Sequence, residues 1–312
     1  MSGDLPIEVD VSEWPALEEE QLGSKPKLWL LRPIPHEPRN PGASEEAWLW
    51  KARTFNHDSA GRRFAKGDDW AEIVAAEVAE RIGVPHAEVR LARRDEQLGV
   101  ISLEMTMMLE SLVHGNELLE EAGVSVSGTI ERSAYTVDAV RRSLRDVEPP
   151  EDHITLTSAW DWFVGYLLLD AIVSNTDRHH ENWGAIARWQ GPPVLAPSFD
   201  HASSLGFAIS DEERRERLST PDRGRSVERY ARRAKSKFAG RPKTTEVVEQ
   251  AIALSPPEVV AEWRDRLAAV LDELPSAVDA IPESRMSKDA RTFARAMIGL
   301  NGHRSLSLLS VP

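Results

Sequence analysis

Cysteine is absent from the 312 residues of the chain. Without it the chain can form no disulfide bond, no thiolate zinc site and no cysteine nucleophile. Long apolar runs are absent as well, because no stretch approaches the roughly 18 consecutive apolar residues of a membrane-spanning helix. The longest apolar-rich stretch, residues 160–173, is interrupted by Asp161, Gly165 and Asp170. The sequence therefore predicts a protein that does not cross a membrane.

Basic residues are absent from the first 20 positions, which contain seven acidic residues. A secretory leader needs a basic start followed by an apolar stretch, so the sequence predicts a cytoplasmic protein. The acidic run itself indicates a solvated arm, or a loosely attached strand, over 1–20. The whole chain has a formal net charge of −13, which argues against a general binder of nucleic acid or of anionic membranes.

Two phosphate-binding motifs are also missing. The chain contains neither G-x-G-x-x-G nor G-x-x-x-x-G-K-[ST], so it gives no support to a dinucleotide-binding fold or a Walker-type site. A candidate phosphate loop remains at residues 22–27, where Gly23 and Ser24 precede two lysines, the second of which is Lys27. A loop of this composition forms a modest nest for anions. The alternative is a plain turn before the first strand.

The length of the chain corresponds to about two domains, or to one unit of two lobes. In the first hundred residues, short apolar segments bounded by Pro, Gly and Asn predict strands at 27–32, 47–55, 89–92 and 100–105. Apolar residues recur every three to four positions over 69–82, which predicts a helix that ends at Gly83. This order predicts a small sheet with one helix inserted after the strand that carries Lys51.

After residue 115 the pattern becomes mainly helical. Residues 155–174 are apolar on almost every side, as expected for a helix in the middle of a helical region. A hairpin is predicted over 183–199, and amphipathic helices over 245–283 and 287–299. The ten tryptophans are expected to be core residues rather than a platform for stacked bases. The sequence as a whole predicts an α+β protein.

Dense polar sequence follows both the apolar helix and the predicted hairpin, at 174–184 and 199–206. Buried polar groups are costly unless they form hydrogen bonds, so polar clusters at such places tend to serve function. Asp177 is followed five residues later by Asn182, and Asp200 comes after the hairpin. Kinases need these residue types, because one carboxylate faces the incoming hydroxyl while an amide oxygen and a second carboxylate hold Mg²⁺. Taken alone, the D-x-x-x-x-N spacing suits a helix or turn cap equally well.

A kinase also needs a cation on the ATP phosphates, held by an acid from a nearby helix. Lys51 lies between apolar residues of a predicted strand, where an unpaired lysine would be costly. Glu72 is its expected partner, and Glu77 is the rival on the same helix. The alternative for Lys51 is an edge-strand lysine that reaches solvent.

Six segments carry a resemblance to known proteins: GSKPKLWL (23–30), WLWKARTF (48–55), DDWAEIVAAEVAERIGVPHAEV (68–89), LVHGNELL (112–119), SNTDRHHENWG (174–184) and LAPSFDHASSLG (195–206). Together they resemble the HipA-like serine/threonine kinase family, which is similar in turn to the phosphatidylinositol-kinase-like branch of the kinase superfamily. The resemblance implies a bilobal protein-kinase-like fold with ATP between the lobes. It divides the chain into an acidic arm at 1–20, an antiparallel-sheet N-lobe with one helix at 21–109 and a helical C-lobe at 110–312.

The resemblance also implies roles for individual residues. Asp177 would be the catalytic base, His179 would order its loop, and Asn182 and Asp200 would bind Mg²⁺. The ATP phosphate site would consist of Gly23, Ser24, Lys27, Lys51 and Glu72. The substrate would be a Ser or Thr hydroxyl of a protein, Ser24 would be a candidate for autophosphorylation, and an antitoxin-like partner is expected.

Three alternatives stay open. The same residues could phosphorylate a small molecule or a lipid headgroup, although the sequence shows no membrane-binding helix. A pseudokinase could bind nucleotide and act as a scaffold, an interpretation that the joint presence of Lys51, Asp177 and the two metal ligands disfavours. A metal-dependent hydrolase could instead bind a transition metal through imidazole and carboxylate groups. Its candidate ligands are Asp177, His179, His180, Asp200 and His201.

Residues 213–243 differ in composition from the rest of the chain, with 12 basic and four acidic residues. Their net charge of +8 leaves about −21 for the remainder of the chain. The segment is interpreted either as a charged helix pair that binds acidic neighbours, or as a docking surface for an acidic or phosphate-rich partner. Composition alone does not separate these interpretations.

Overall fold

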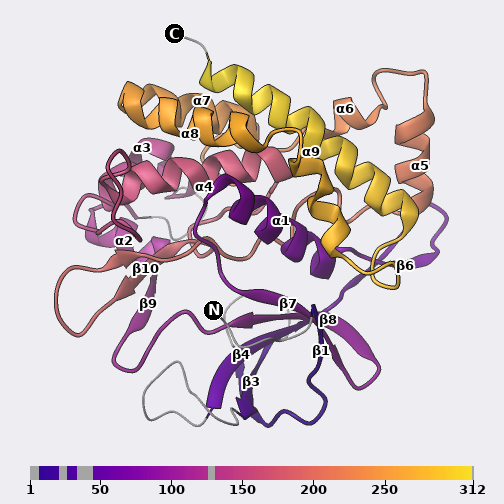
Figure 1. The fold of residues 1–312 in the computed structure, drawn as a ribbon, viewed down its shortest axis with the longest axis horizontal. Helices are drawn as coiled ribbons and strands as arrows, with labels where there is room; N and C mark the ends of the chain where they lie inside the picture. The colour runs from indigo at the N-terminus through magenta and orange to yellow at the C-terminus, as the bar shows by residue number, and fades with distance from the viewer. Residues whose placement is uncertain (1–6, 21–26, 34–44, 126–130, 311–312) are drawn as a thin grey trace.

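The computed structural model describes residues 7–20, 27–33, 45–125 and 131–310, which form a sheet-rich region and a helix-rich region (Figure 1). The fold is mixed α+β, as the sequence predicts. Figure 1 shows the strands of the larger sheet gathered at one end of the molecule, below a layer of helices.

A six-stranded sheet forms most of the sheet-rich region, in the order β1-β7-β8-β4-β3-β2. Its strands are β1 (Glu8–Asp10), β2 (Ala16–Glu20), β3 (Lys27–Pro33), β4 (Glu45–Ala52), β7 (Val89–Arg94) and β8 (Gln97–Leu103). β1 pairs with β7 in parallel, and the other neighbours pair antiparallel. All four strands expected here from the sequence are present.

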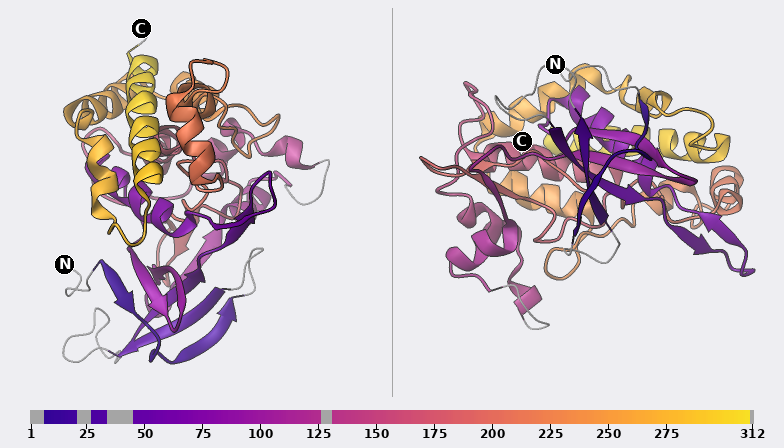
Figure 2. Two further views of the ribbon diagram at one scale, coloured as in Figure 1. Left: turned by 90° about the vertical axis from the view of Figure 1, so that its right-hand side faces the viewer. Right: turned by 90° about the horizontal axis from the view of Figure 1, so that it is seen from below.

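The segment predicted as one strand over 47–55 is divided in two. β4 ends at Ala52, and β5 (Phe55–His57) pairs with β6 (Arg63–Ala65) as a separate hairpin. This hairpin projects from the body of the molecule (Figure 2). Its turn residue Arg62 forms an ion pair with Glu212, which lies at the start of α5 (Asp211–Ser219).

The acidic segment 1–20 supplies both edge strands of the large sheet, β1 and β2, within its described residues. Val9 and Val11 alternate with acidic residues, and both valines are buried in the same small core as Trp48. Burial of these apolar side chains stabilises the edge of the sheet. The described part of the segment therefore forms strands that pair with the sheet, which corresponds to the attached strand of the two alternatives given for it.

α1 (Asp68–Ile82) contacts β7 and β8 of the sheet as well as the helices α4 (Ala159–Val173), α8 (Pro257–Val270) and η2 (Leu274–Ala280). It is the helix predicted over 69–82. Gly83 ends it with a φ of 70°, in the left-handed region that glycine adopts without steric cost. Most residues of α1 are buried, including Glu72, so the helix places a carboxylate inside the molecule.

α4 runs through the middle of the helix-rich region, and all of its residues are buried. It begins at Ala159, later than the sequence predicts, because Ser158 and Asp161 form a capping box. The Ser158 hydroxyl accepts a hydrogen bond from the Asp161 amide, and the Asp161 carboxylate accepts one from the Ser158 amide. Ser174 ends the helix in the left-handed conformation, where the polar sequence begins.

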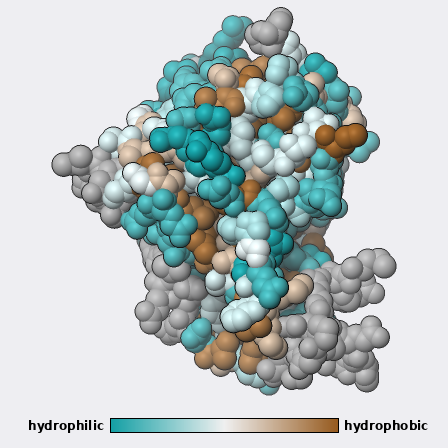
Figure 3. All heavy atoms as spheres, turned by 90° about the vertical axis from the view of Figure 1, so that its left-hand side faces the viewer, coloured by the Kyte–Doolittle hydropathy of each residue, from teal (hydrophilic) through white to brown (hydrophobic). Residues whose placement is uncertain are grey.

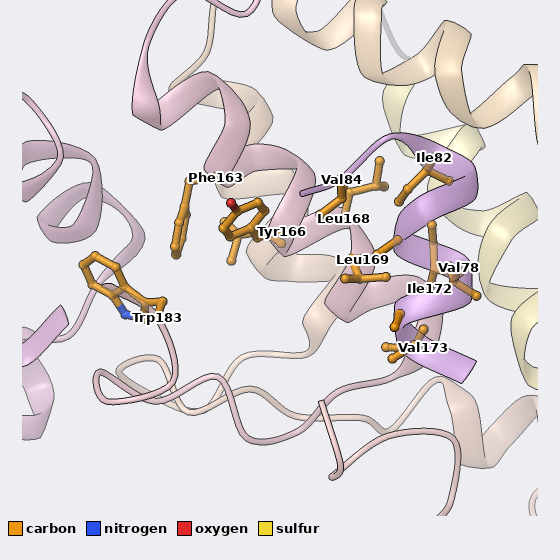
Figure 4. Packing of buried hydrophobic residues seen from close by; sticks show 14 of the residues in the cluster. Val78, Ile82, Val84, Phe163, Tyr166, Leu168, Leu169, Ile172, Val173 and Trp183 are labelled. Carbon is orange, nitrogen blue, oxygen red and sulfur yellow. The ribbon is translucent and has the colours of Figure 1, made fainter. Parts of the chain in front are cut away.

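The main core lies around α4. Figure 4 shows Leu169 and Ile172 of α4 beside Val78 of α1. Nearer the start of α4, the Phe163 ring contacts the Trp183 ring edge to face, with ring centroids 5.2 Å apart. This contact anchors the end of the polar loop that follows the helix. The least exposed tryptophans are Trp48, Trp162, Trp183 and Trp263. Their burial confirms the expectation for these four tryptophans, whereas Trp189 is 76% exposed, so the expectation is wrong for that residue.

The other elements of the helix-rich region include the predicted hairpin and the predicted C-terminal helices, together with short elements that were not predicted individually. They are β9 (Ser111–His114), α2 (Gly115–Glu121), η1 (Glu131–Ala134), α3 (Val137–Ser143), β10 (Gly184–Ala187), β11 (Val194–Leu195), α6 (Val227–Ala231), α7 (Thr244–Ala253) and α9 (Lys288–Leu309). The predicted hairpin is β10–β11, which β9 extends to three strands. The face in Figure 3 is a mosaic of hydrophilic and hydrophobic residues. Within the described residues, no helix combines the length and apolarity needed to span a membrane.

Candidate active site

The loop after α4 is held by hydrogen bonds that join the predicted site residues to each other and to their neighbours. The Asp177 amide donates to Asn175 Oδ1 at 3.0 Å, and the Asp177 carbonyl accepts from Asn182 Nδ2 at 2.9 Å. The His179 amide donates to the same carbonyl at 2.7 Å. His179 Nδ1 in turn accepts from the Glu181 amide at 3.2 Å. Asp177, His179 and Asn182 therefore lie in one compact turn, with the Asp177 side chain 35% exposed.

Arg178 ties this loop to the rest of the molecule. Its guanidinium is buried against Asp170 of α4, with Nε 2.8 Å from Oδ2 and Nη2 2.8 Å from Oδ1. It also donates to the Asn182 carbonyl at 2.8 Å and to Ser198 Oγ at 2.9 Å. Arg178 is not among the residues predicted from the sequence. The available signal is Asp170, an acid near the end of an apolar helix, which needs a buried partner.

Asp200 lies between two lysines from neighbouring strands. Lys51 Nζ is 3.2 Å from Asp200 Oδ1, and Lys27 Nζ is 4.0 Å from Asp200 Oδ2. The two lysines are directly opposite each other on β4 and β3. Burial works against ionisation of Asp200, but the charges of Lys51 and Lys27 outweigh it and hold the pKa of this carboxyl far below its usual range. The site therefore presents an ionised carboxylate.

The backbone at Asp200 is in an uncommon conformation. Its φ of 58° lies in the left-handed region, which costs a non-glycine residue about 1 kcal/mol or more. Aspartate tolerates this region better than most residues do. Such conformations persist where the surroundings impose them, and they cluster at functional sites.

Glu72 extends from α1 toward the site that contains Lys51 and Asp200. Its Oε1 accepts a hydrogen bond of 2.9 Å from the His201 amide, and the His201 ring contacts Ser198 Oγ at 2.8 Å. Burial would raise the pKa of Glu72, but the His201 hydrogen bond and the Lys51 charge lower it below its ordinary value. Burial likewise would lower the pKa of Lys51, and the charges of Asp200 and Glu72 raise it instead.

Glu77, the rival of Glu72, faces elsewhere. Its carboxylate is 3.9 Å from Arg81 one turn along α1, and its side chain is 39% exposed. Glu72 is therefore the glutamate of α1 that acts on Lys51. The direct ion pair of Lys51 is with Asp200, however, and in the part of the chain that the structure describes Glu72 Oε2 is buried without a hydrogen-bond partner.

Lys237 is a further residue at this site that the sequence analysis placed only in the basic segment. Its Nζ lies 3.0 Å from Asp177 Oδ1. Of the predicted phosphate loop, Lys27 contacts the site, whereas Gly23 and Ser24 lie outside the described residues. The structure thus gathers Lys27, Lys51, Glu72 and Asp200 into one set of interacting charges. The Arg178–Ser198 contact links that set to the loop of Asp177.

The donor set suits a hard cation. The Asn182 side chain donates through Nδ2 to the Asp177 carbonyl, so Oδ1 is the end of the amide that would bind a cation. The charges of the two lysines keep Asp200 ionised. Mg²⁺ prefers such oxygen ligands and retains several waters, so few protein ligands suffice. The set proposed for a transition-metal hydrolase does not form: across the described ranges, no three His, Asp or Glu side chains gather in an arrangement that could hold a metal ion.

A family profile described as the HipA-like C-terminal domain matches residues 21–263. Among solved structures, the chain is similar to the proinflammatory kinase CtkA of Helicobacter pylori, with a TM-score of 0.70, 17% sequence identity and 96% of each chain covered. It is also similar to HipA of the Shewanella oneidensis MR-1 toxin–antitoxin system, solved with HipB and operator DNA. That match has a TM-score of 0.50, 12% identity, and covers 96% of this chain and 68% of the other. No curated protein sequence matches the chain.

Proposed function

Because the chain belongs to the HipA-like C-terminal domain family, we propose that it is a kinase that transfers the γ-phosphoryl group of Mg·ATP to a Ser or Thr hydroxyl of a protein. The observation that carries the proposal is the ion pair between Lys51 and Asp200, which joins the sheet-rich region to the loop that follows β11. In this proposal residues 21–109 act as the N-lobe and 110–312 as the C-lobe, with ATP between them.

Asp177 is the proposed catalytic base. Its side chain is partly exposed, so an incoming hydroxyl can reach it, while its backbone is fixed by Asn175 and Asn182. In the transfer, the hydroxyl oxygen bonds to the γ-phosphorus, the bond from that phosphorus to the bridging oxygen breaks, and ADP leaves. The hydroxyl proton passes to Asp177.

The phosphates of ATP are assigned to the cations of the sheet. Lys51 and Lys27 lie opposite each other on neighbouring strands, and both ammonium groups approach Asp200. Gly23 and Ser24, which lie outside the described residues, are assigned to the phosphate site from the sequence alone. The negative charge of Glu72 raises the pKa of Lys51 and so favours the protonated ammonium group. Glu72 Oε2 is buried without a hydrogen-bond partner among the described residues, and we propose that it accepts from Lys51 when a ligand engages Asp200.

Asn182 and Asp200 are the residues that would hold Mg²⁺. The metal supplies positive charge that neutralises the phosphate oxygens during transfer. The role of the chain is to fix both side chains before the ligand arrives. Asn182 is fixed through Asp177 and Arg178, and Asp200 is fixed by its two lysines and its left-handed backbone.

We propose partners of two classes for this protein. The Shewanella oneidensis HipA is solved with HipB, so an antitoxin-like partner is proposed for this chain too. An acidic or phosphate-rich partner is proposed for 213–243, and a cytoplasmic location for the protein. The competing functions on the same residues are a small-molecule or lipid-headgroup kinase and a nucleotide-binding pseudokinase scaffold.

The test is transfer from γ-labelled ATP by the full chain, with and without Mg²⁺, beside Asp200→Ala. The proposal predicts Mg²⁺-dependent label on the chain or on an added protein, and none with Asp200→Ala. Peptide mapping of the label then tests Ser24 as the autophosphorylated residue. Label found only on a small molecule would favour the alternative kinase, and Mg²⁺-dependent ATP binding without any transfer to an acceptor would favour the pseudokinase.

A further inference from the structure

Lys237 directs its ammonium group at the proposed catalytic base, 3.0 Å from Asp177 Oδ1. The side chains are 43% and 35% exposed, so the pair lies at the open side of the site and remains reachable by a ligand. Lys237 belongs to the basic segment 213–243, but it differs from other paired cations there. Those others bind acids outside the site, in the pairs Arg214–Asp211, Arg215–Asp289, Arg217–Glu213, Arg225–Glu216, Arg232–Glu228 and Lys243–Glu246.

The backbone that carries Lys237 is fixed relative to the catalytic loop. Phe238, the next residue, is buried and stacks on Tyr135, with ring centroids 4.4 Å apart and planes 6° apart. The Tyr135 hydroxyl donates to the carbonyl of Arg178 at 3.1 Å, and Arg178 directly follows Asp177. The Ala239 amide donates to the Tyr135 carbonyl at 2.8 Å. These contacts hold both sides of the Lys237–Asp177 pair, so its geometry is built into the fold.

The cations of the site are divided between its two aspartates. Lys51 and Lys27 approach Asp200 from the sheet, whereas Lys237 approaches Asp177 from the helix-rich region. A base beside an ATP γ-phosphoryl group brings two anions together, and their repulsion opposes transfer. An ammonium group has three donors, so it can keep one contact with Asp177 and give another to a phosphoryl oxygen.

We infer that Lys237 is a catalytic residue of this kinase, which binds an oxygen of the γ-phosphoryl group on the side of the incoming hydroxyl. The inference rests on the proposed function and adds a residue to it. Lys237 keeps its proton throughout, because the hydroxyl proton goes to Asp177. The γ-phosphoryl oxygen held by Lys237 stays on phosphorus as the bridging bond to ADP breaks.

The inference is tested by comparing two ligands that differ in the γ-phosphoryl group. The dissociation constants of the β,γ-imido analogue of ATP and of ADP are measured with Mg²⁺ on the full chain by calorimetry. Lys237→Ala is expected to weaken binding of the ATP analogue about tenfold, as loss of a charge-assisted hydrogen bond does, and to leave ADP unchanged. Lys237→Arg keeps the charge and is expected to retain most of the preference.

Lys235→Ala is the matched control, because it removes the same charge from an exposed residue of the same loop. It is expected to leave both dissociation constants unchanged. The inference is overturned if Lys237→Ala weakens both ligands equally or neither, since Lys237 then does not contact the γ-phosphoryl group. If the wild-type chain binds neither nucleotide, the proposed function fails, and the inference fails with it. These two failures are distinguished by the wild-type measurement alone.

Discussion

Arg178 and Asp170 form a buried ion pair of two hydrogen bonds, Nε to Oδ2 and Nη2 to Oδ1, each 2.8 Å long. The side chains are 1% and 6% exposed, so neither charge has water as an alternative partner. Removing one partner from such a pair costs about 3–5 kcal/mol. Asp170→Asn is therefore expected to lower the free energy of unfolding by about 3 kcal/mol or more, measured by urea denaturation.

A double variant separates the ion pair from simple packing. Asp170→Asn with Arg178→Met removes both charges and is expected to be more stable than Asp170→Asn alone, because no buried charge is left unpaired. The double variant should still lose transfer activity, since Arg178 no longer holds the carbonyl of Asn182. A double variant less stable than Asp170→Asn would show that the unpaired charge of Arg178 is not what destabilises the single variant, which would contradict this prediction.

Lys51 is the main cation of Asp200 in this structure and the proposed ligand of the ATP phosphates. Lys51→Met keeps the apolar stem and removes the charge. We expect at least a tenfold loss of Mg·ATP affinity, because charge-assisted hydrogen bonds to the phosphates disappear. The affinity is measured by equilibrium binding of a fluorescent ATP analogue in the presence of Mg²⁺. Lys66→Met, a lysine over the Phe207 ring, is the control and should bind as the wild type does.

Glu72 and Glu77 lie on the same helix, so they form a matched pair of tests. Glu72→Gln removes the charge that supports Lys51 while its amide oxygen can still accept from the His201 amide. We expect the rate of transfer to fall about tenfold, because Lys51 loses a neighbouring negative charge that favours its protonated form. Glu77→Gln changes only a partly exposed pair with Arg81 and should change the rate less than twofold. Equal effects of the two variants would contradict the assignment of Glu72.

His179 gives the protein a predicted pH dependence. Burial lowers the pKa of His179 below its ordinary value, against the charges of Asp177 and Glu181. Its neutral Nδ1 accepts from the Glu181 amide, which the protonated ring cannot do. The unfolded chain takes up this proton near pH 6.5 and the folded chain only at lower pH. Stability from this group is therefore complete above about pH 6.5 and is lost as the pH falls through the folded pKa.

The check is urea denaturation of the wild type and His179→Gln between about pH 7.5 and about pH 5.5. Glutamine retains an acceptor but does not titrate, so the variant should lose less stability over this range than the wild type. Equal losses in the two proteins would show that His179 does not carry the effect.

The residues that sequence analysis found are those marked by local pattern. Lys51 stands out as a charge inside an apolar strand, and Asp177 with Asn182 as polar residues after an apolar helix. α1 and α4 follow from periodicity, because burial of one face or of the whole helix leaves a readable repeat. The start of α4 was misplaced because Ser158 and Asp161 form a cap that the apolar pattern does not show.

The residues that it missed depend on contacts between distant parts of the chain. Arg285 is buried and binds Asp69 of α1 at 2.9 Å, across a sequence separation of 216 residues. β1 joins the sheet by parallel pairing with β7, about 80 residues away, which no local pattern specifies. Lys237 was visible only as one base among twelve, and its place beside Asp177 depends on the stacking of Phe238 on Tyr135.

The central claim is that Asp177 serves as the base of phosphoryl transfer, and Asp177→Asn tests it most directly. The measurement is the rate of transfer from γ-labelled Mg·ATP at saturating ATP, together with the Mg·ATP dissociation constant. Asparagine preserves the size of the side chain, so ATP affinity should stay within about threefold while the rate falls by about 100-fold or more. Transfer by Asp177→Asn at the wild-type rate would contradict the assignment of the base. Absence of transfer in the wild type with any protein acceptor would contradict the kinase itself.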